Sequence, residues 1–200
     1  MAEFNEDLRD LKSIGQGDVE AFSRIYEVYW KKVYGFAYRM SGRQSVAEDI
    51  THEVFLVIIQ KPESFSPERG SLLTFLCSIA RHQILNYFRR KGYEISDSFD
   101  EENQMFLMSS DCGNNPLSML LEKELVEKVN ESIASLPILQ REVLILREFQ
   151  ELSYKEISIV ADAEVNVIKA RLFRARRTLY KKLAGYMKSK GESCYEVRRS

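Results

Sequence analysis

The sequence is poor in the residues that build disulfide frameworks and metal sites. It has three cysteines, Cys77, Cys112 and Cys194, and two histidines, His52 and His82, among 200 residues. These residues are too few and too scattered for a disulfide framework or a zinc site. Cys77 lies in an apolar helical pattern and is expected in the core. Cys112 and Cys194 lie in polar segments, where a redox role and an incidental free thiol both stay open. We expect no metal and no cofactor.

Long hydrophobic runs are also absent. The longest, residues 54–59, is far too short to cross a bilayer, so no membrane insertion is expected. Residues 1–10 are acidic, which does not fit a secretory signal. With 44% hydrophobic and 30% charged residues, the chain fits a globular protein of one or two small domains. We therefore expect a cytoplasmic protein.

Acidic residues are missing from one long segment. No aspartate or glutamate lies between residues 165 and 190, although the whole chain has a net charge of −1. The cations of this segment are Lys169, Arg171, Arg174, Arg176, Arg177, Lys181, Lys182, Lys188 and Lys190. A basic helix on a nearly neutral protein is typical of a surface that binds a polyanion. The alternative is a solvated amphipathic helix whose cations only keep it soluble.

Two short helical patterns around this segment predict a helix–turn–helix. Ser153 and Glu156 have the spacing of a capping box, Asp162 tolerates the left-handed conformation that ends a helix, and Asn166 is a suitable N-cap. In the second helix, apolar residues fall on one face and leave the other for DNA. The residues predicted to contact DNA there are Asn166, Val167, Lys169, Ala170, Arg171, Arg174 and Arg177.

The rest of the chain predicts an all-α fold with two small helical domains. Helices are expected at residues 18–41, 45–60, 71–91, 116–135 and 137–149, the second opened by a capping box of Ser45 and Glu48. Prolines and a glycine make residues 61–70 a loop. Residues 94–115 are acidic and free of lysine and arginine, which predicts a flexible linker. The expected units are an N-terminal domain (1–93), this acidic linker (94–115), a C-terminal domain (116–187) and a tail (188–200) without an interpretation.

Two patterns in the N-terminal domain suggest binding surfaces. Residues 79–91 mix cations with aromatic rings, a combination that suits single-stranded DNA, although a helical core with a basic end explains it equally well. Glu48, Asp49, His52 and Glu53 share one face of the second helix. A metal site there would need ligands from other helices, so a solvated face or a protein-docking face is favoured.

In order and spacing, the segments of this chain resemble an extracytoplasmic-function sigma factor, the two-domain class of initiation subunits of bacterial RNA polymerase. The segments that carry the resemblance are residues 17–34, 47–55, 79–90, 136–143, 152–157 and 165–179. The resemblance implies that Glu48, Asp49, His52 and Glu53 dock on the clamp helices of the largest polymerase subunit. It also implies that the third helix and the loop before it bind and hold open the minus-ten element. The candidates for that contact are Phe65, Arg69, Arg81, His82, Asn86, Arg89 and Arg90.

The same resemblance implies that the helix–turn–helix binds the minus-thirty-five element, that its flank touches the polymerase flap, and that the chain itself catalyses nothing. Some residues depart from the family pattern. His52 stands where glutamine is usual, His82 and Asn86 stand where asparagine and aspartate are common, and Val167 replaces a small hydroxyl residue. Silencing by an anti-sigma factor, by the C-terminal tail or by control of expression stays open.

Two other functions fit parts of the sequence. A helix–turn–helix regulator would bind duplex DNA without polymerase, which leaves the N-terminal surfaces without a role. A metal-dependent nuclease using Glu48, Asp49 and His52 would be an enzyme, and it would lose activity with Glu48→Ala. The promoter sequence, the regulon and the inducing signal are not predicted by the sequence.

Overall fold

The computed structural model describes residues 2–93, 95 and 118–197, and within these ranges it contains helices and no strand. The α-helices are α1 (Ala2–Ile14), α2 (Val19–Ser41), α3 (Gln44–Gln60), α4 (Leu72–Arg90), α5 (Ser118–Ala134), α6 (Ile138–Glu148), α7 (Tyr154–Ala161) and α8 (Val165–Val197). Two 3-10 turns, η1 (Pro62–Ser64) and η2 (Pro67–Arg69), lie in the loop before α4. The all-α prediction is confirmed. The predicted acidic linker lies almost entirely outside the described residues.

Helices α2, α3 and α4 form a bundle whose ends follow the local sequence. Asp18 caps α2 by accepting hydrogen bonds from the backbone amides of Glu20 and Ala21, and Gly42 ends it with a φ of +67°. Ser71 caps α4 by accepting from the amide of Thr74. The predicted helices at 18–41 and 71–91 are therefore confirmed within two residues at each end.

Helix α1 was not predicted, because charged residues mask its apolar spacing. Leu11 and Ile14 are buried and Leu8 packs against the same core. Burial of one such side chain contributes about 1.5–3 kcal/mol, enough to hold a short helix against α2. An ion pair between Arg24 and Asp10 and a hydrogen bond from the Tyr29 hydroxyl to Asp7 complete the contact.

The capping box predicted at Ser45 is wrong. Helix α3 begins at Gln44, with Arg43 as an N-cap that makes no side-chain hydrogen bond. The Ser41 hydroxyl bonds the amide of Arg43 instead, and the Gln44 side chain donates to Glu48. Ser45 therefore lies inside the first turn of the helix, and Glu48 does not fold back to cap it.

The helix–turn–helix is built as its sequence predicts, apart from one cap. Ser153 and Glu156 form the capping box of α7, and Asp162 ends that helix with a φ of +47°. Helix α8 begins at Val165, so Asn166 lies in its first turn and is not its N-cap. Ile168, Leu172 and Ala175 are buried against the rest of the C-terminal helices.

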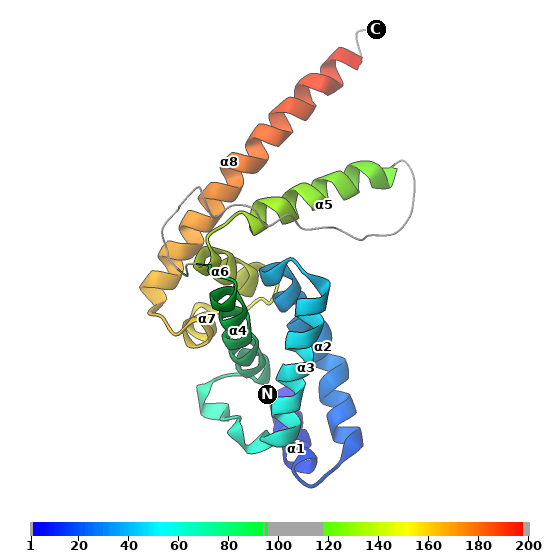
Figure 1. Cartoon of the computed structure of the whole chain (residues 1–200), viewed down its shortest axis with the longest axis vertical. Coiled ribbons are helices and arrows are strands. Elements are labelled where there is room, and N and C mark those ends of the chain that lie inside the picture. Colours follow the sequence, from blue (N-terminus) through cyan, green and yellow to red (C-terminus); the bar gives the residue numbers. More distant parts are fainter. Residues whose placement is uncertain (1, 94, 96–117, 198–200) are drawn as a thin grey trace.

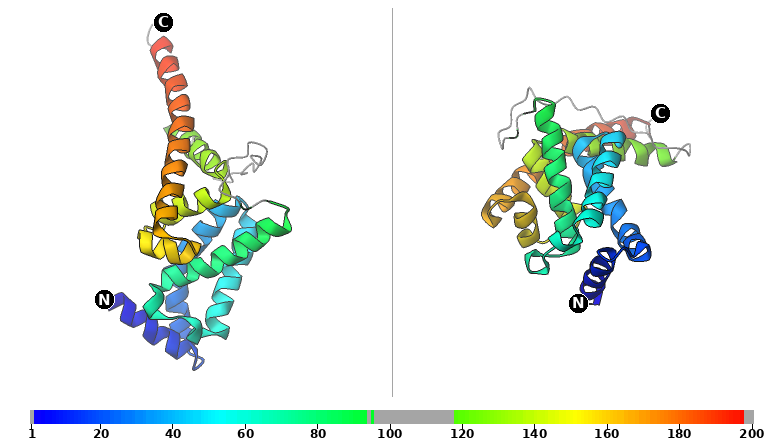
Figure 2. Two further views of the ribbon diagram at one scale, coloured as in Figure 1. Left: turned by 90° about the vertical axis from the view of Figure 1, so that its left-hand side faces the viewer. Right: turned by 60° about the horizontal axis from the view of Figure 1, so that its bottom comes forward.

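The N-terminal and C-terminal helices pack directly on each other, with α4 against α7 and α2 against α6 (Figure 1). The buried side chains of both groups form one continuous core, which includes Cys77. Burial raises the pKa of the Cys77 thiol to about 12, so it stays protonated at neutral pH. Figure 2 shows α8 extending well beyond the other helices. Among the described residues, no helix has the length and apolar character needed to span a membrane.

Candidate nucleic-acid and protein interfaces

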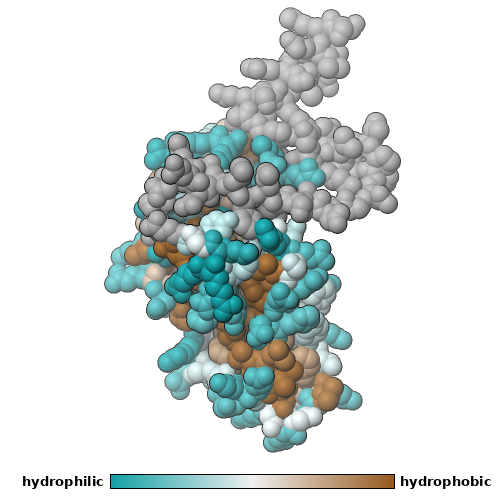
Figure 3. Space-filling view, in the orientation of Figure 1, coloured by the Kyte–Doolittle hydropathy of each residue, from teal (hydrophilic) through white to brown (hydrophobic). Residues whose placement is uncertain are grey.

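The face predicted to dock on polymerase is an exposed surface of α3. Glu48, Asp49, His52 and Glu53 are all exposed, and α3 contains no lysine or arginine. Leu56 and Ile59 continue this face toward the end of the helix, with 43% and 48% of their surfaces exposed. Figure 3 shows hydrophobic side chains gathered over this part of the molecule. Within the described residues, no group of three or more His, Cys, Asp and Glu side chains could hold a metal ion.

A row of aromatic rings on α2 borders α3, and the sequence did not predict it as a surface. The rings recur every fourth residue and are half-buried; they are Phe22, Tyr26, Trp30, Tyr34 and Tyr38. Tyr26 and Trp30 stack at 6.3 Å between ring centroids, and Tyr26 lies 4.8 Å from Phe55 of α3. Burial, and then the charge of Glu48, raise the pKa of Tyr34, which places this ring near the acidic face. A stripe at helical spacing indicates core in a sequence, and these half-buried rings do pack against the core, with Phe22 and Tyr26 in contact with Phe55 of α3.

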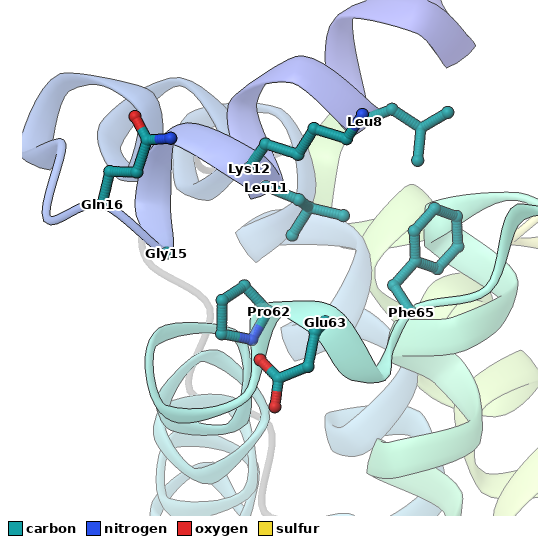
Figure 4. A pocket seen from close by; sticks show the side chains of 8 residues that line it. All are labelled: Leu8, Leu11, Lys12, Gly15, Gln16, Pro62, Glu63 and Phe65. Carbon is teal, nitrogen blue, oxygen red and sulfur yellow. The ribbon is translucent and has the colours of Figure 1, made fainter.

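The loop before α4 lies between two cavities, and Phe65 lines both. Phe65 is only 8% exposed and packs on Phe75 at 5.6 Å between ring centroids. One cavity, of about 450 Å³, lies between α1 and η1 beside Leu8, Leu11 and Pro62 (Figure 4). The other, of about 270 Å³, is lined by Ser64, Phe65, Ser66, Arg69, Gly70, Ser71, Thr74, Phe75, Ser78 and Ile159. The structure therefore places Phe65 in a cavity wall, and Arg69 at the second cavity.

The predicted minus-ten residues on α4 divide into two sets. His82, Asn86 and Arg89 form a line along the helix, in which Asn86 Nδ2 lies 3.3 Å from His82 Nδ1 and Arg89 donates to Asn86 Oδ1 at 3.3 Å. His82, Arg89 and Arg90 are exposed. Arg81 is different, because its guanidinium is paired with Glu142 of α6 and its side chain is 18% exposed.

The basic face of α8 carries most, but not all, of the predicted DNA contacts. Asn166, Val167, Lys169, Ala170, Arg174 and Arg177 are exposed. Arg171 is only 9% exposed, because it lies on the side of the helix that faces the C-terminal core with Leu172. Arg176 is paired with Glu148 of α6, a contact that raises the pKa of its guanidinium.

One exposed residue on this face was missed from the sequence. The Phe173 side chain is 67% exposed and lies between the basic residues of α8. A single exposed apolar side chain is not unusual in itself, but the place of this ring among the cations of α8 makes it a candidate for contact with DNA. The sequence could have revealed this exposure, because Phe173 does not share the helical spacing of the buried residues Ile168, Leu172 and Ala175.

Comparisons with known proteins match both halves of the molecule. The family model of sigma-70 region 2 matches residues 25–93, which contain most of α2 and all of α3 and α4. The model of sigma-70 region 4 matches residues 127–179, which reach from α5 into α8. The ECF RNA polymerase sigma factor SigW of Bacillus subtilis is 30% identical over 86% of this chain and 94% of its own length. The ECF RNA polymerase sigma-E factor of Haemophilus influenzae is 30% identical over 94% of this chain and 100% of its own.

Two solved structures share the fold. The sigma factor RpoE of Bartonella quintana, in complex with the anti-sigma factor NepR, has a TM-score of 0.64 at 23% identity and covers 83% of this chain and 98% of its own. CnrH, in complex with the cytosolic domain of CnrY, has a TM-score of 0.65 at 17% identity and covers 90% of this chain and 98% of its own.

Proposed function

The chain belongs to the extracytoplasmic-function sigma factors, which direct promoter-specific transcription initiation, and from this premise we propose which of its surfaces meet polymerase and which meet the promoter. Sigma factors are non-catalytic subunits of RNA polymerase, and we infer that this chain too makes or breaks no bond. It works in the cytoplasm with the polymerase, as an N-terminal domain (1–93) and a C-terminal domain (116–187).

The exposed face of α3 docks on core polymerase. Its contacts are Glu48, Asp49, His52 and Glu53, and the partner is the pair of clamp helices of the largest subunit. Carboxylates without nearby cations on the same helix attract a basic partner and speed association. The exposed Leu56 and Ile59 add apolar area at the end of the same face.

Helix α4 and the loop before it hold the unpaired strand of the minus-ten element. His82, Asn86, Arg89 and Arg90 offer donors to bases and phosphates along one helix. The cavity of about 270 Å³ beside Phe65 and Arg69 accepts one unstacked base, since two aromatic rings and several hydroxyl groups line it. Binding of that base offsets part of the free energy needed to open the duplex.

Helix α8 reads the duplex of the minus-thirty-five element. Asn166, Val167, Lys169, Ala170, Arg174 and Arg177 face the groove and its phosphates. Arg171 supports this face from its buried side. Phe173 adds an apolar contact of the kind that distinguishes the thymine methyl group. The flank of the same domain contacts the polymerase flap.

The observation that carries the proposal is that the acidic face and the basic faces are exposed on different helices. Helix α3 carries the carboxylates, while the C-terminal end of α4 and the outer side of α8 carry the cations. Polymerase and DNA therefore do not compete for the same side chains. Because the two solved structures named above hold an anti-sigma factor or a cytosolic partner domain, we also propose an anti-sigma factor as a regulatory partner.

The test is to mix the purified chain with core RNA polymerase, isolate the complex by size exclusion and footprint open complexes on genomic DNA. We expect a stable complex that melts a defined set of promoters. Asp49→Lys should abolish association with core, because it places a cation in the middle of the docking face. Glu27→Lys, the same change at an exposed position of α2 outside that face, should not.

Two results would contradict the assignment. Binding of Asp49→Lys to core with wild-type affinity would show that α3 is not the docking face. Binding of the wild-type chain to duplex DNA without any affinity for core would instead favour a helix–turn–helix regulator.

A further inference from the structure

Three side chains in the C-terminal half of α4 are joined by hydrogen bonds into the His82–Asn86–Arg89 row. The amide nitrogen of Asn86 lies 3.3 Å from Nδ1 and 3.5 Å from Nε2 of His82, and Arg89 donates to Asn86 Oδ1 at 3.3 Å. His82 and Arg89 are exposed, and Asn86 is half-buried. The row is therefore a polar surface with an internal order that a ligand can reach.

The hydrogen-bonding capacity of each group fixes its orientation in this row. Arginine only donates, so Arg89 binds Asn86 through the amide oxygen and turns the amide nitrogen toward His82. That nitrogen also only donates, so it needs a ring nitrogen of His82 that carries no proton. The other ring nitrogen then keeps its N–H for a ligand. Arg89 therefore positions Asn86, and Asn86 positions His82.

The row presents two donors side by side. The remaining N–H of His82 and the second N–H of Asn86 belong to nitrogens no more than 3.5 Å apart, whichever ring nitrogen accepts. In the major groove of DNA, only guanine has two adjacent acceptors, N7 and O6. Adenine and cytosine each place a donor there, and thymine places a methyl group beside its single acceptor. A pair of donors therefore fits guanine better than any other base.

The usual contact between asparagine and adenine is disfavoured in this row. Asparagine binds adenine with its amide oxygen and its amide nitrogen together. Here the oxygen of Asn86 accepts from Arg89, and the nitrogen donates to His82. Adenine would compete with both neighbours of Asn86, whereas guanine needs only the hydrogens that the row leaves over.

The row continues the side of α4 that lines the cavity of about 270 Å³. Thr74 and Ser78 line that cavity, and His82 and Asn86 follow at intervals of four residues, which keeps them on nearly the same side of the helix. From Ser78 to Asn86 is about 12 Å at 1.5 Å per residue, the length of about three to four base pairs at 3.4 Å each. With an unstacked base in the cavity, the row therefore lies beside base pairs at the edge of the opened region.

We propose that the His82–Asn86–Arg89 row recognises a guanine in the major groove at the edge of the opened minus-ten element, and that Arg89 is the positioning residue of this row. The inference rests on the proposed function of α4 and adds the base that the helix selects. The ligand is a G·C base pair that is still closed, next to the strand that α4 holds open. Arg90, which is exposed and outside the row, contributes only its charge.

The experiment compares single base pairs at the edge of the opened region in their binding to the holoenzyme. One promoter from the footprinted set is varied one base pair at a time over four positions on each side of that region, and sequencing counts the bound fraction of each variant. We expect one position at which guanine is bound about tenfold better than the other three bases.

Two changes within the row should alter this preference in different ways. Asn86→Asp replaces the amide donor by an acceptor of the same shape, so the preference should move from guanine to cytosine, whose N4 group donates. Arg89→Lys keeps the charge, so the salt slope should stay the same. The guanine preference should nevertheless fall about threefold, because lysine lacks the planar fork of donors that orients the amide.

Arg90→Ala is the matched control. Arg90 is an exposed cation next to Arg89, but no hydrogen bond joins it to the row in the part of the chain that the structure describes. Its loss should weaken binding to all sequences alike and flatten the salt slope by about 0.9, the value for one phosphate of B-form DNA. The ratio between guanine and the other bases should not change.

The outcomes separate the proposed function from this inference. If the wild-type holoenzyme opens no promoter, the proposed function fails. If it opens promoters but prefers guanine at none of the varied positions, recognition by the row is wrong. A guanine preference that survives Asn86→Asp would mean that other groups select the base. Arg89 is not a positioning residue if Arg89→Lys keeps the full preference or if Arg90→Ala lowers it as much.

Discussion

Arginines of the C-terminal helices make very different contacts, although all of them are charged. Arg141 and Arg176 are both arginines of the C-terminal helices, but Arg141 is buried and donates to the backbone carbonyls of Met40 and Leu136. Burial lowers the pKa of Arg141 to about 10, so it remains charged at neutral pH and joins the two domains through backbone contacts. Arg176 stays at the surface beside Glu148. A cation on the C-terminal helices is therefore not by itself a DNA contact.

Phe173 offers the clearest test at the residue scale. Because 67% of its surface is exposed, Phe173→Ala should change the free energy of unfolding by less than about 0.5 kcal/mol. It should weaken binding of the holoenzyme to its minus-thirty-five duplex by about 1 kcal/mol, roughly the value of one buried methyl group, with the loss confined to positions that hold thymine. Binding to single-base variants of the duplex measures both effects.

Tyr180→Ala is the control for that prediction. Tyr180 is 76% exposed and lies seven residues further along α8, about 10 Å away at 1.5 Å per residue, beyond the groove-facing end of the helix. Its removal should leave base preference unchanged. Equal losses in the two variants would mean that exposed rings on α8 support DNA binding only in a general way.

At the scale of the helix, the position of the N-terminus depends on the residues that precede the capping pattern. The capping-box pattern occurs at Ser45 and at Ser153, but only Ser153 makes the bonds. Near Ser45 the left-handed Gly42 and the bond between Ser41 and the amide of Arg43 allow the helix to start earlier. The capping-box spacing shows which capping hydrogen bonds are possible. The conformation of the turn before the helix determines which of them form.

These two serines give a matched pair of variants. Ser153→Ala should lower the free energy of unfolding by about 1 kcal/mol, because it leaves the amide of Glu156 without its cap. The same variant should weaken duplex binding, since α7 holds α8 in place. Ser45→Ala, at an exposed position without a cap bond, should be neutral. Urea unfolding of both variants measures the difference, and equal midpoints would contradict the assignment of the cap.

The sequence predicts the elements of this fold better than it predicts their contacts. Helices α2, α4 and α7 were predicted from apolar spacing and capping residues, because both are local features that involve residues only a few positions apart. Helix α1 was not predicted, because acidic residues interrupt the regular spacing of its apolar residues. The burial of Arg171 was not predicted either. It precedes the buried Leu172 by one position, and a charged residue there is normally assigned to the exposed face of a helix.

For the whole molecule, the contacts between the two domains could not be read from the sequence. Arg81 and Glu142 lie 61 positions apart, and Gln150 donates to the carbonyl of Lys32 across 118 positions. Glu142 looks like an ordinary charged residue at the start of α6, and nothing local marks it as fully buried. Its burial is revealed only by the packing of α6 on the N-terminal helices, where it meets Arg81 of α4.

The closed arrangement predicts a large change of shape when polymerase binds. Donor and acceptor dyes on Ser23→Cys of α2 and Lys155→Cys of α7, both exposed, should give high energy transfer in the free chain. Cys77 needs no replacement, because it is buried and burial raises its pKa to about 12, whereas Cys112 and Cys194 should be changed to serine.

Core polymerase should lower the transfer strongly, since the two promoter elements are about 25 base pairs and therefore roughly 85 Å apart. Asp49→Lys, which we expect not to bind core, should keep the high value. Glu156→Gln should lower the transfer even without core, because it removes the charge that draws α7 onto Ser71 and Thr74. Unchanged transfer in a proven wild-type complex would mean that the domains stay closed on polymerase, and the elements would then have to be read in some other way.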